Sequence, residues 1–125
     1  MRRQKNEKNK TLMIVDDDKD LVKVLTRFAT GMRWRVIAAK DGTEAMRILG
    51  TGKPNLIILD INMPKINGDE LLGYIKGDPH LQGVPVLIIT GDAGGLDKSL
   101  TRGVGILEKP LKIEVLEALL TAMGQ

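Results

Sequence analysis

Four short apolar runs in the chain are each followed by polar residues that could take part in phosphoryl chemistry. These residues are Asp16 and Asp17, Asp60, Thr90, and Lys109. Carboxylates held close together repel one another unless a cation lies between them. A site made only of oxygen ligands favours Mg2+, which keeps several of its waters and accepts phosphate oxygens. The residue types therefore point to a Mg2+-dependent reaction of a phosphoryl group.

Each residue has a role in such a reaction. An ionised Asp60 is suited to attack phosphorus as a nucleophile. Thr90 offers a hydroxyl and Lys109 a positive charge, and both can bind the equatorial oxygens of the transferring group. Taken singly, the residues have simpler interpretations, because Asp17 or Asp18 could be a helix N-cap and the others turn residues. The four positions together favour one site.

The elements that must position these residues alternate along the chain. Short β-rich runs lie at residues 12–15, 34–38, 56–59, 84–89 and 104–107. Segments of helical period lie at residues 20–30, 43–49, 68–76, 96–101 and 113–123. Three of the β-rich runs are almost continuously apolar, which is typical of strands buried on both faces of a parallel sheet. Five β-α units predict an α/β fold with helices on both faces, and ligands bind such sheets at the carboxyl ends of the strands.

Composition limits the other possibilities. Hydrophobic residues make up 42% of the 125 residues, which is enough for the core of one domain. The absence of cysteine excludes disulfides, thiol catalysis and cysteine-bound zinc. Aromatic residues make up only 2%, which argues against stacking on nucleic-acid bases. No apolar run approaches the roughly 20 residues of a membrane span, so we expect a cytoplasmic protein.

The positive charge is concentrated at the N-terminus. Residues 1–10 carry five basic side chains and one acidic one, whereas the remainder carries 14 basic and 15 acidic residues. We therefore expect a basic, disordered tail at 1–10 and one domain at 11–125. Such a tail could contact nucleic acid or an acidic partner. A solvated leader is the simpler interpretation.

Several motifs together resemble one family. They are Val15-Asp16-Asp17, the segment Leu59-Asp60-Ile61-Asn62-Met63-Pro64 followed by Gly68, Thr90-Gly91, and Lys109-Pro110. The turn Ala39-Lys40-Asp41-Gly42 with Glu44 also fits. From about residue 10 to residue 123 the chain resembles the response regulator receiver domains of two-component systems. The resemblance implies a flavodoxin-like (βα)5 fold with the strand order 2-1-3-4-5.

The resemblance also implies roles for individual residues. Asp17 and Asp60 would bind Mg2+ through their carboxylates and Asn62 through its backbone carbonyl, with Asp16 acting through water. Asp60 would be phosphorylated by a sensor histidine kinase or a phosphotransfer protein. Thr90 would then move toward the phosphate, and Lys109 would bind it. The Lys-Pro peptide bond would be cis.

By the same resemblance, the fourth helix, fifth strand and last helix form the face that docks a downstream protein. Ile106 stands where the family usually has an aromatic switch residue, and Leu111 stands where an aromatic residue often follows Lys-Pro. We expect a monomer or weak homodimer that is not a turnover enzyme. A membrane is not expected as a partner, and nucleic acid is disfavoured.

Two alternatives have different chemistry. The pattern Asp16-x-Asp18 is similar to haloacid-dehalogenase-like phosphatases, in which Asp16 would be the nucleophile. That family adds an acidic pair after the lysine, whereas here only Glu114 and Glu117 follow. The second alternative is a degenerate receiver that serves only as a protein-binding module, which the intact set of polar residues disfavours.

Overall fold

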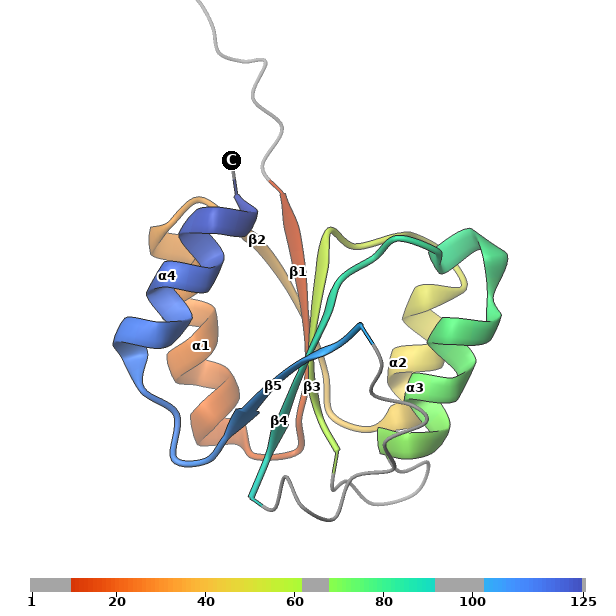
Figure 1. Cartoon of the computed structure of the whole chain (residues 1–125), viewed down its shortest axis with the longest axis horizontal. Helices are drawn as coiled ribbons and strands as arrows, with labels where there is room; N and C mark the ends of the chain where they lie inside the picture. Colours follow the sequence, from red (N-terminus) through yellow and green to blue (C-terminus); the bar gives the residue numbers. More distant parts are fainter. Residues whose placement is uncertain (1–9, 62–67, 92–102, 125) are drawn as a thin grey trace, which may run out of the picture.

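Strands and helices alternate around one parallel sheet (Figure 1). The computed structural model describes residues 10–61, 68–91 and 103–124. The strands are β1 (Thr11–Val15), β2 (Arg35–Ala39), β3 (Leu56–Asp60), β4 (Val86–Thr90) and β5 (Gly105–Glu108). The helices are α1 (Lys19–Gly31), α2 (Gly42–Leu49), α3 (Gly68–Gly77) and α4 (Ile113–Met123), with a 3-10 turn at Pro79–Leu81. The sheet order is β2-β1-β3-β4-β5, which confirms the predicted order 2-1-3-4-5.

The helices cover both faces of the sheet, as Figure 1 shows, with α1 and α4 on one side and α2 and α3 on the other. Leu25 of α1 and Leu116 of α4 pack with Leu12 and Ile58 of the sheet in one buried cluster. Residues of α2 and α3 pack on the opposite face with Met13 and the alternate residues of β3. The strands β1, β3 and β4 are buried almost throughout, which explains their continuous apolar sequences.

Side-chain caps fix where the first two helices begin. Asp18 is the N-cap of α1, and its carboxylate accepts the backbone N–H groups of Asp20 and Leu21 at 3.0 and 3.2 Å. Asp41 caps α2 by accepting the Glu44 N–H at 2.8 Å, and the Glu44 carboxylate accepts the Lys40 N–H at 2.8 Å. Such reciprocal caps satisfy backbone donors that the first turn leaves free.

Three strands begin later than predicted, and the fifth does so by one residue, at Gly105 and not at Val104. The second strand begins at Arg35 because the N–H of Trp34 bonds to the carbonyl of Ala29 at the end of α1, 3.0 Å away. Trp34 itself is only 4% exposed. The fourth strand begins at Val86 and not at Val84, because the Val84 N–H bonds to Leu81 in a turn and Pro85 has no N–H.

Three predictions lie outside the described residues. They are the basic N-terminal tail, of which only Lys10 is described, the backbone carbonyl of Asn62, and the helix at residues 96–101. In the described part of the chain, no helix combines the length and the apolar character that crossing a membrane requires.

Candidate functional site

The carboxyl ends of four strands bring the predicted site residues to one edge of the sheet. Asp16 follows β1 directly, Asp60 is the last residue of β3, and Thr90 is the last residue of β4. Lys109 comes immediately after β5. All neighbouring strands pair in parallel, so these ends lie side by side although they are widely separated in sequence.

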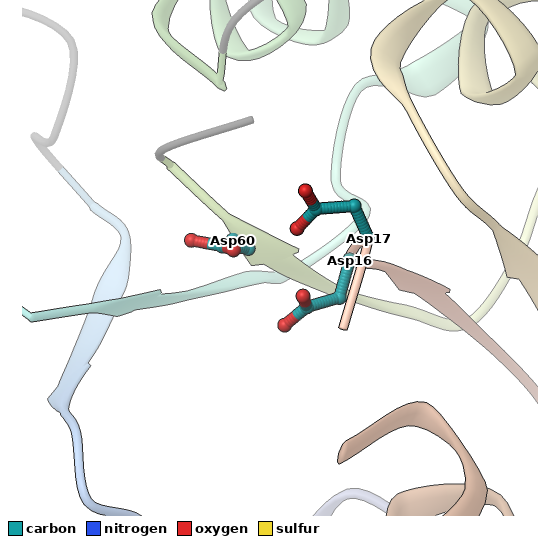
Figure 2. A group of neighbouring side chains, drawn as sticks. All are labelled: Asp16, Asp17 and Asp60. Atoms are coloured by element: carbon teal, nitrogen blue, oxygen red, sulfur yellow. The ribbon is translucent and has the colours of Figure 1, made fainter. Parts of the chain in front are cut away.

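Three carboxylates meet at this edge. One carboxylate oxygen from each of Asp16, Asp17 and Asp60 lies within 4.8 Å of the others. Figure 2 shows the three side chains gathered at the ends of β1 and β3. Asp16 and Asp60 are 3% and 4% exposed, whereas Asp17 is exposed to solvent. An all-oxygen set with one open side fits a hard divalent cation that retains water.

Asp16 is the least satisfied member of the cluster. Its backbone N–H bonds to Ala39 at 3.1 Å, and its Oδ1 accepts the Asp18 N–H at 2.9 Å. Its buried Oδ2 has no hydrogen-bond partner among the described residues. Burial raises the pKa of Asp16 from 3.8 to about 6, and the nearby charge of Asp60 acts in the same direction. The Asp18 N–H and Lys109 oppose this rise. A bound cation would supply the missing partner, so the residues fit Mg2+.

Lys109 supplies the positive charge of the site. Its ammonium nitrogen lies 3.6 Å from Oδ2 of Asp60 and 4.0 Å from Oδ2 of Asp16. Its backbone N–H donates to the carbonyl of Thr90 at 2.8 Å, which fixes the chain where β5 ends. The following bond, Lys109–Pro110, is cis, as the resemblance implied. The lysine side chain is 34% exposed, so it is accessible to an incoming anionic group.

Thr90 is completely buried at the end of β4. Asp60 pairs with Ile89 in the sheet register, so Thr90 lies one residue further along the neighbouring strand. Thr90 in turn pairs with Glu108, the residue before Lys109. Thr90 therefore lies between Asp60, at the end of β3, and Lys109, which follows β5.

Two positioning residues were not recognised as such from the sequence. Ala39 accepts the Asp16 N–H and so holds the acidic pair against the end of β2. Buried Asp41 caps α2 immediately beyond that point. The turn belongs to the motifs of the family resemblance, and the pattern Asp41-x-x-Glu44 is the sequence signal that could have identified Asp41 as the cap.

A cleft gives the acidic cluster an opening on the side of α1 and α2. Its volume is about 560 Å³, and its lining includes Asp16, Asp17, Lys40 and Asp41. Neither Asp60 nor Lys109 belongs to the lining. The cleft therefore reaches the cluster from the side of Asp17, and the face that carries Lys109 is separate.

Comparison with known proteins gives a consistent result. Residues 12–121 match the response regulator receiver domain family. The chain is 32% identical over 111 residues to a probable cyclic di-GMP phosphodiesterase of Vibrio cholerae serotype O1, covering 86% of this chain and 25% of that protein. It is 28% identical over 107 residues to the polar-differentiation response regulator DivK of Brucella anthropi, covering 83% of this chain and 87% of DivK.

A solved structure agrees with these matches. The signal receiver domain of a signal transduction histidine kinase from Syntrophus aciditrophicus has a TM-score of 0.81 and 27% identity, with 91% of this chain and 89% of that one covered. Most of these curated relatives are much longer, and the chain spans less than half of each of seven of them. The match over residues 12–121, together with the fold, shows that this chain belongs to the response regulator receiver domain family.

Proposed function

We propose that Asp60 accepts a phosphoryl group in a reaction that requires Mg2+ held by Asp16, Asp17 and Asp60, with the backbone carbonyl of Asn62 as a further ligand. Receiver domains bind Mg2+ at a cluster of acidic residues and interact with histidine kinases or phosphotransfer proteins. The observation that carries the proposal is the placement of Lys109 3.6 Å from Asp60 at the edge of a three-carboxylate cluster.

The reaction transfers phosphorus between two nucleophiles. A carboxylate oxygen of Asp60 forms a bond to phosphorus while the bond from phosphorus to the imidazole nitrogen of a donor phosphohistidine breaks. The imidazole keeps the electron pair of that bond and takes up a proton. Bound Mg2+ would neutralise charge on the phosphoryl oxygens. Asp60 needs no general base, because an ionised carboxylate already carries the attacking electron pair.

Lys109 and Thr90 complete the site by binding the transferring oxygens. The lysine ammonium lies beside the carboxylate that attacks phosphorus. It can therefore stabilise the negative charge on the phosphoryl oxygens during the transfer to Asp60. After transfer, the acyl phosphate presents its oxygens at the end of β4, where Thr90 is located. A hydrogen bond from the Thr90 hydroxyl to that phosphate would favour one arrangement of the β4 end over another.

The proposed docking surface for a downstream protein includes β5 and α4. Ile106 of β5 is 39% exposed, and Ile113 and Val115 of α4 are 42% and 40% exposed. β5 is the edge strand next to β4, and its last residue, Glu108, pairs with Thr90 in the sheet register. A change at Thr90 can therefore alter this surface directly. Ile106 takes the place of the aromatic residue common in the family.

A phosphatase that uses Asp16 as the nucleophile is less consistent with the geometry. Oδ1 of Asp16 is occupied by the Asp18 N–H, and the lysine is closer to Asp60 than to Asp16. These features favour Asp16 as a cation ligand and Asp60 as the nucleophile.

Incubation with acetyl phosphate and Mg2+, followed by phosphate-affinity electrophoresis, tests the proposal. The full chain should give a shifted band that EDTA abolishes. The Asp60→Asn variant should give no shifted band, whereas Asp20→Asn, an exposed residue in the first turn of α1, should behave as the parent does. No shift of the parent protein under any Mg2+ concentration would support a receiver that serves only in binding.

A further inference from the structure

The edge of the sheet opposite the acidic cluster is strongly basic. Four cationic residues lie there, at the amino ends of β1, β2 and β3 or just before them. We call them the basic edge, and they are Lys10, Arg33, Arg35 and Lys53. Because β1 separates Lys10 from Asp16, the basic edge lies roughly 20 Å from the acidic cluster, at about 3.3 Å per residue. Figure 1 shows β1 beginning beside the end of α4 and running away from it.

Backbone hydrogen bonds hold these cations together. The carbonyl of Lys10 accepts the Arg35 N–H at 2.7 Å. On the other side of β1, Thr11 exchanges two bonds with Asn55, one from the Asn55 N–H and one to its side-chain Oδ1, each at 2.8 Å. Lys53 precedes Asn55 by two residues, and Arg33 precedes Arg35 by two. The cations are thus brought to one edge by the ladder of the sheet itself.

The charge at this edge is not neutralised by the fold. No Asp or Glu occurs in residues 10–15, 31–35 or 50–57, which form this edge around β2, β1 and β3. Within the described ranges, none of the four cations forms an ion pair. Arg33, Arg35 and Lys53 are exposed, and Lys10 is half-buried. The sequence adds Arg2, Arg3, Lys5 and Lys8 immediately before Lys10, against one acidic residue, Glu7.

Arg33 has a backbone conformation that favours another residue. Its φ is +73°, the left-handed region that glycine adopts without strain. Its N–H closes the end of α1 by donating to Thr30 at 3.0 Å. Arginine at this position places a positive charge beside the carboxyl end of α1, which is favourable. It also adds a fourth cation to the basic edge.

The composition of the whole chain disfavours nucleic acid as a partner, but the placement of these cations leads to a different conclusion. We propose that the basic edge binds the phosphate backbone of double-stranded DNA without reading its sequence. Such binding requires clustered Lys and Arg that neutralise phosphates and little else. Single strands are disfavoured because they stack on exposed aromatic residues, and Trp34 at this edge is only 4% exposed. This proposal does not depend on phosphorylation of Asp60, which takes place at the opposite edge.

Other anionic partners fit less well. Membrane-surface segments combine basic residues with apolar ones that enter the lipid. Residues 1–9 contain no apolar residue other than Met1. A stable interface with an acidic protein usually has an apolar or aromatic centre. At the basic edge, however, Trp34 and Pro54 are buried, and the exposed residues are polar, basic or glycine. Uniformly charged phosphate is the partner that this surface fits.

Two triple variants of the full chain test the proposal. The edge variant is Arg33→Gly/Arg35→Gln/Lys53→Gln, in which glycine suits the positive φ of position 33. The matched control is Lys19→Gln/Lys23→Gln/Lys40→Gln, which removes three exposed cations from the other end of the sheet. Both variants lose the same charge, so only the location differs. Thermal unfolding of each sample shows whether it remains folded.

Fluorescence anisotropy with a labelled 20-base-pair duplex of random sequence is then measured at 50 and 200 mM salt. The parent should bind at 50 mM salt, and the edge variant should bind at least tenfold more weakly. In a plot of log affinity against log salt concentration, the slope of the edge variant should be less steep than that of the parent by about 2–3. The reason is that each of the three lost phosphate contacts contributes about 0.9 to the slope. The control variant and Asp60→Asn should keep most of the parent's affinity.

Three results would overturn the proposal. They are no binding of the duplex by the parent at 50 mM salt, equal weakening in the edge and control variants, and tighter binding to phosphatidylserine vesicles or polyglutamate than to the duplex. If the edge variant is still phosphorylated at Asp60, its loss of DNA binding can be attributed to the basic edge and not to a defect in the phosphorylation site.

Discussion

The side chain of Lys109 reaches Asp60 across an intervening strand, with its ammonium nitrogen 3.6 Å from Oδ2 of the carboxylate. Lys109 follows β5 and Asp60 ends β3, and β4 lies between them in the sheet. The contact therefore passes the end of β4, where Thr90 is buried. The proposed nucleophile, the hydroxyl and the lysine are therefore ordered by strand position.

Replacing Lys109 should separate cation binding from phosphoryl transfer. In Lys109→Gln the three carboxylates lose their nearest positive charge, so Mg2+ should bind several-fold more tightly. Transfer from acetyl phosphate should nevertheless slow by about a hundredfold, as is typical when a group that stabilises the transferring oxygens is removed. Calorimetric titration measures the first effect, and the rate of phosphoprotein formation measures the second.

Lys112→Gln is the control, because this exposed lysine lies three residues further along. It should leave both quantities near the parent's values. Weaker Mg2+ binding in Lys109→Gln would contradict an electrostatic role for the lysine and indicate a structural one.

Neutralising Asp16 should stabilise the protein when no divalent cation is present. The pKa of Asp16 is raised from 3.8 to about 6 in the folded state, so folding binds a proton between these values. The free energy of unfolding therefore falls as pH rises from about 4 to 6, and the deficit persists above 6. In EDTA at pH 7.5, Asp16→Asn should be more stable than the parent by about 1–3 kcal/mol.

Denaturant unfolding at several pH values measures this difference. The advantage of Asp16→Asn should shrink toward zero as the pH falls below 3.8, because the parent's Asp16 is then mostly protonated in both states. Saturating Mg2+ should reverse the order. Asp20→Asn removes an exposed carboxylate that favours the start of α1, so it should destabilise slightly. A parent that is more stable than Asp16→Asn in EDTA at pH 7.5 would contradict the prediction.

The affinity for Mg2+ should depend on pH because Asp16 must lose its proton to act as a ligand or to hold the cation's water. Affinity should rise between pH 5 and pH 7 and level off above that, with a midpoint near the raised pKa of about 6. Asp16→Asn should bind more weakly and show a flatter profile in this range. Calorimetry at constant ionic strength measures both, and a parent profile that is flat from pH 5 to 7 would remove Asp16 from the site.

Thr90→Val should retain the fold and the phosphorylation site but lose the response to phosphorylation. Valine has a similar shape, and Thr90 is fully buried, so packing is largely kept while the hydroxyl is lost. In nuclear magnetic resonance spectra, phosphorylation of the parent should shift the amide signals of Ile106 and Leu107 in β5. The same signals should move much less in phosphorylated Thr90→Val. Equal shifts in the two proteins would mean that the change reaches β5 by another route.

The sequence predicted the architecture well because, in the central strands, a few consecutive apolar residues are enough to identify a buried strand. Continuous apolar runs at β1, β3 and β4 identify buried parallel strands, and the polar residue at the end of each run identifies the edge that carries the candidate site. The strand order was inferred from resemblance and is confirmed by the sheet. Errors of one or two residues arose where backbone hydrogen bonds, not side chains, decide the boundary, as at Trp34 and Pro85.

Details of the site depended on contacts that sequence spacing does not encode. The distance between Lys109 and Asp60 follows from a side chain that crosses the end of β4, and the unsatisfied oxygen of Asp16 follows from its burial after β1. The basic edge was visible in the sequence only as a charged tail. Its continuation onto the folded domain appears when the ladder places Arg35 beside Lys10.

The central claim is that Asp60 is the residue that becomes phosphorylated. The most direct measurement treats the Mg2+- and acetyl-phosphate-labelled protein with borohydride, which reduces an aspartyl phosphate to homoserine, and locates that residue by peptide mass spectrometry. Homoserine should be found at position 60 in the parent and at no position in Asp60→Asn. Homoserine at position 16 or 17 in the parent, or a modified peptide that persists in Asp60→Asn, would contradict the account.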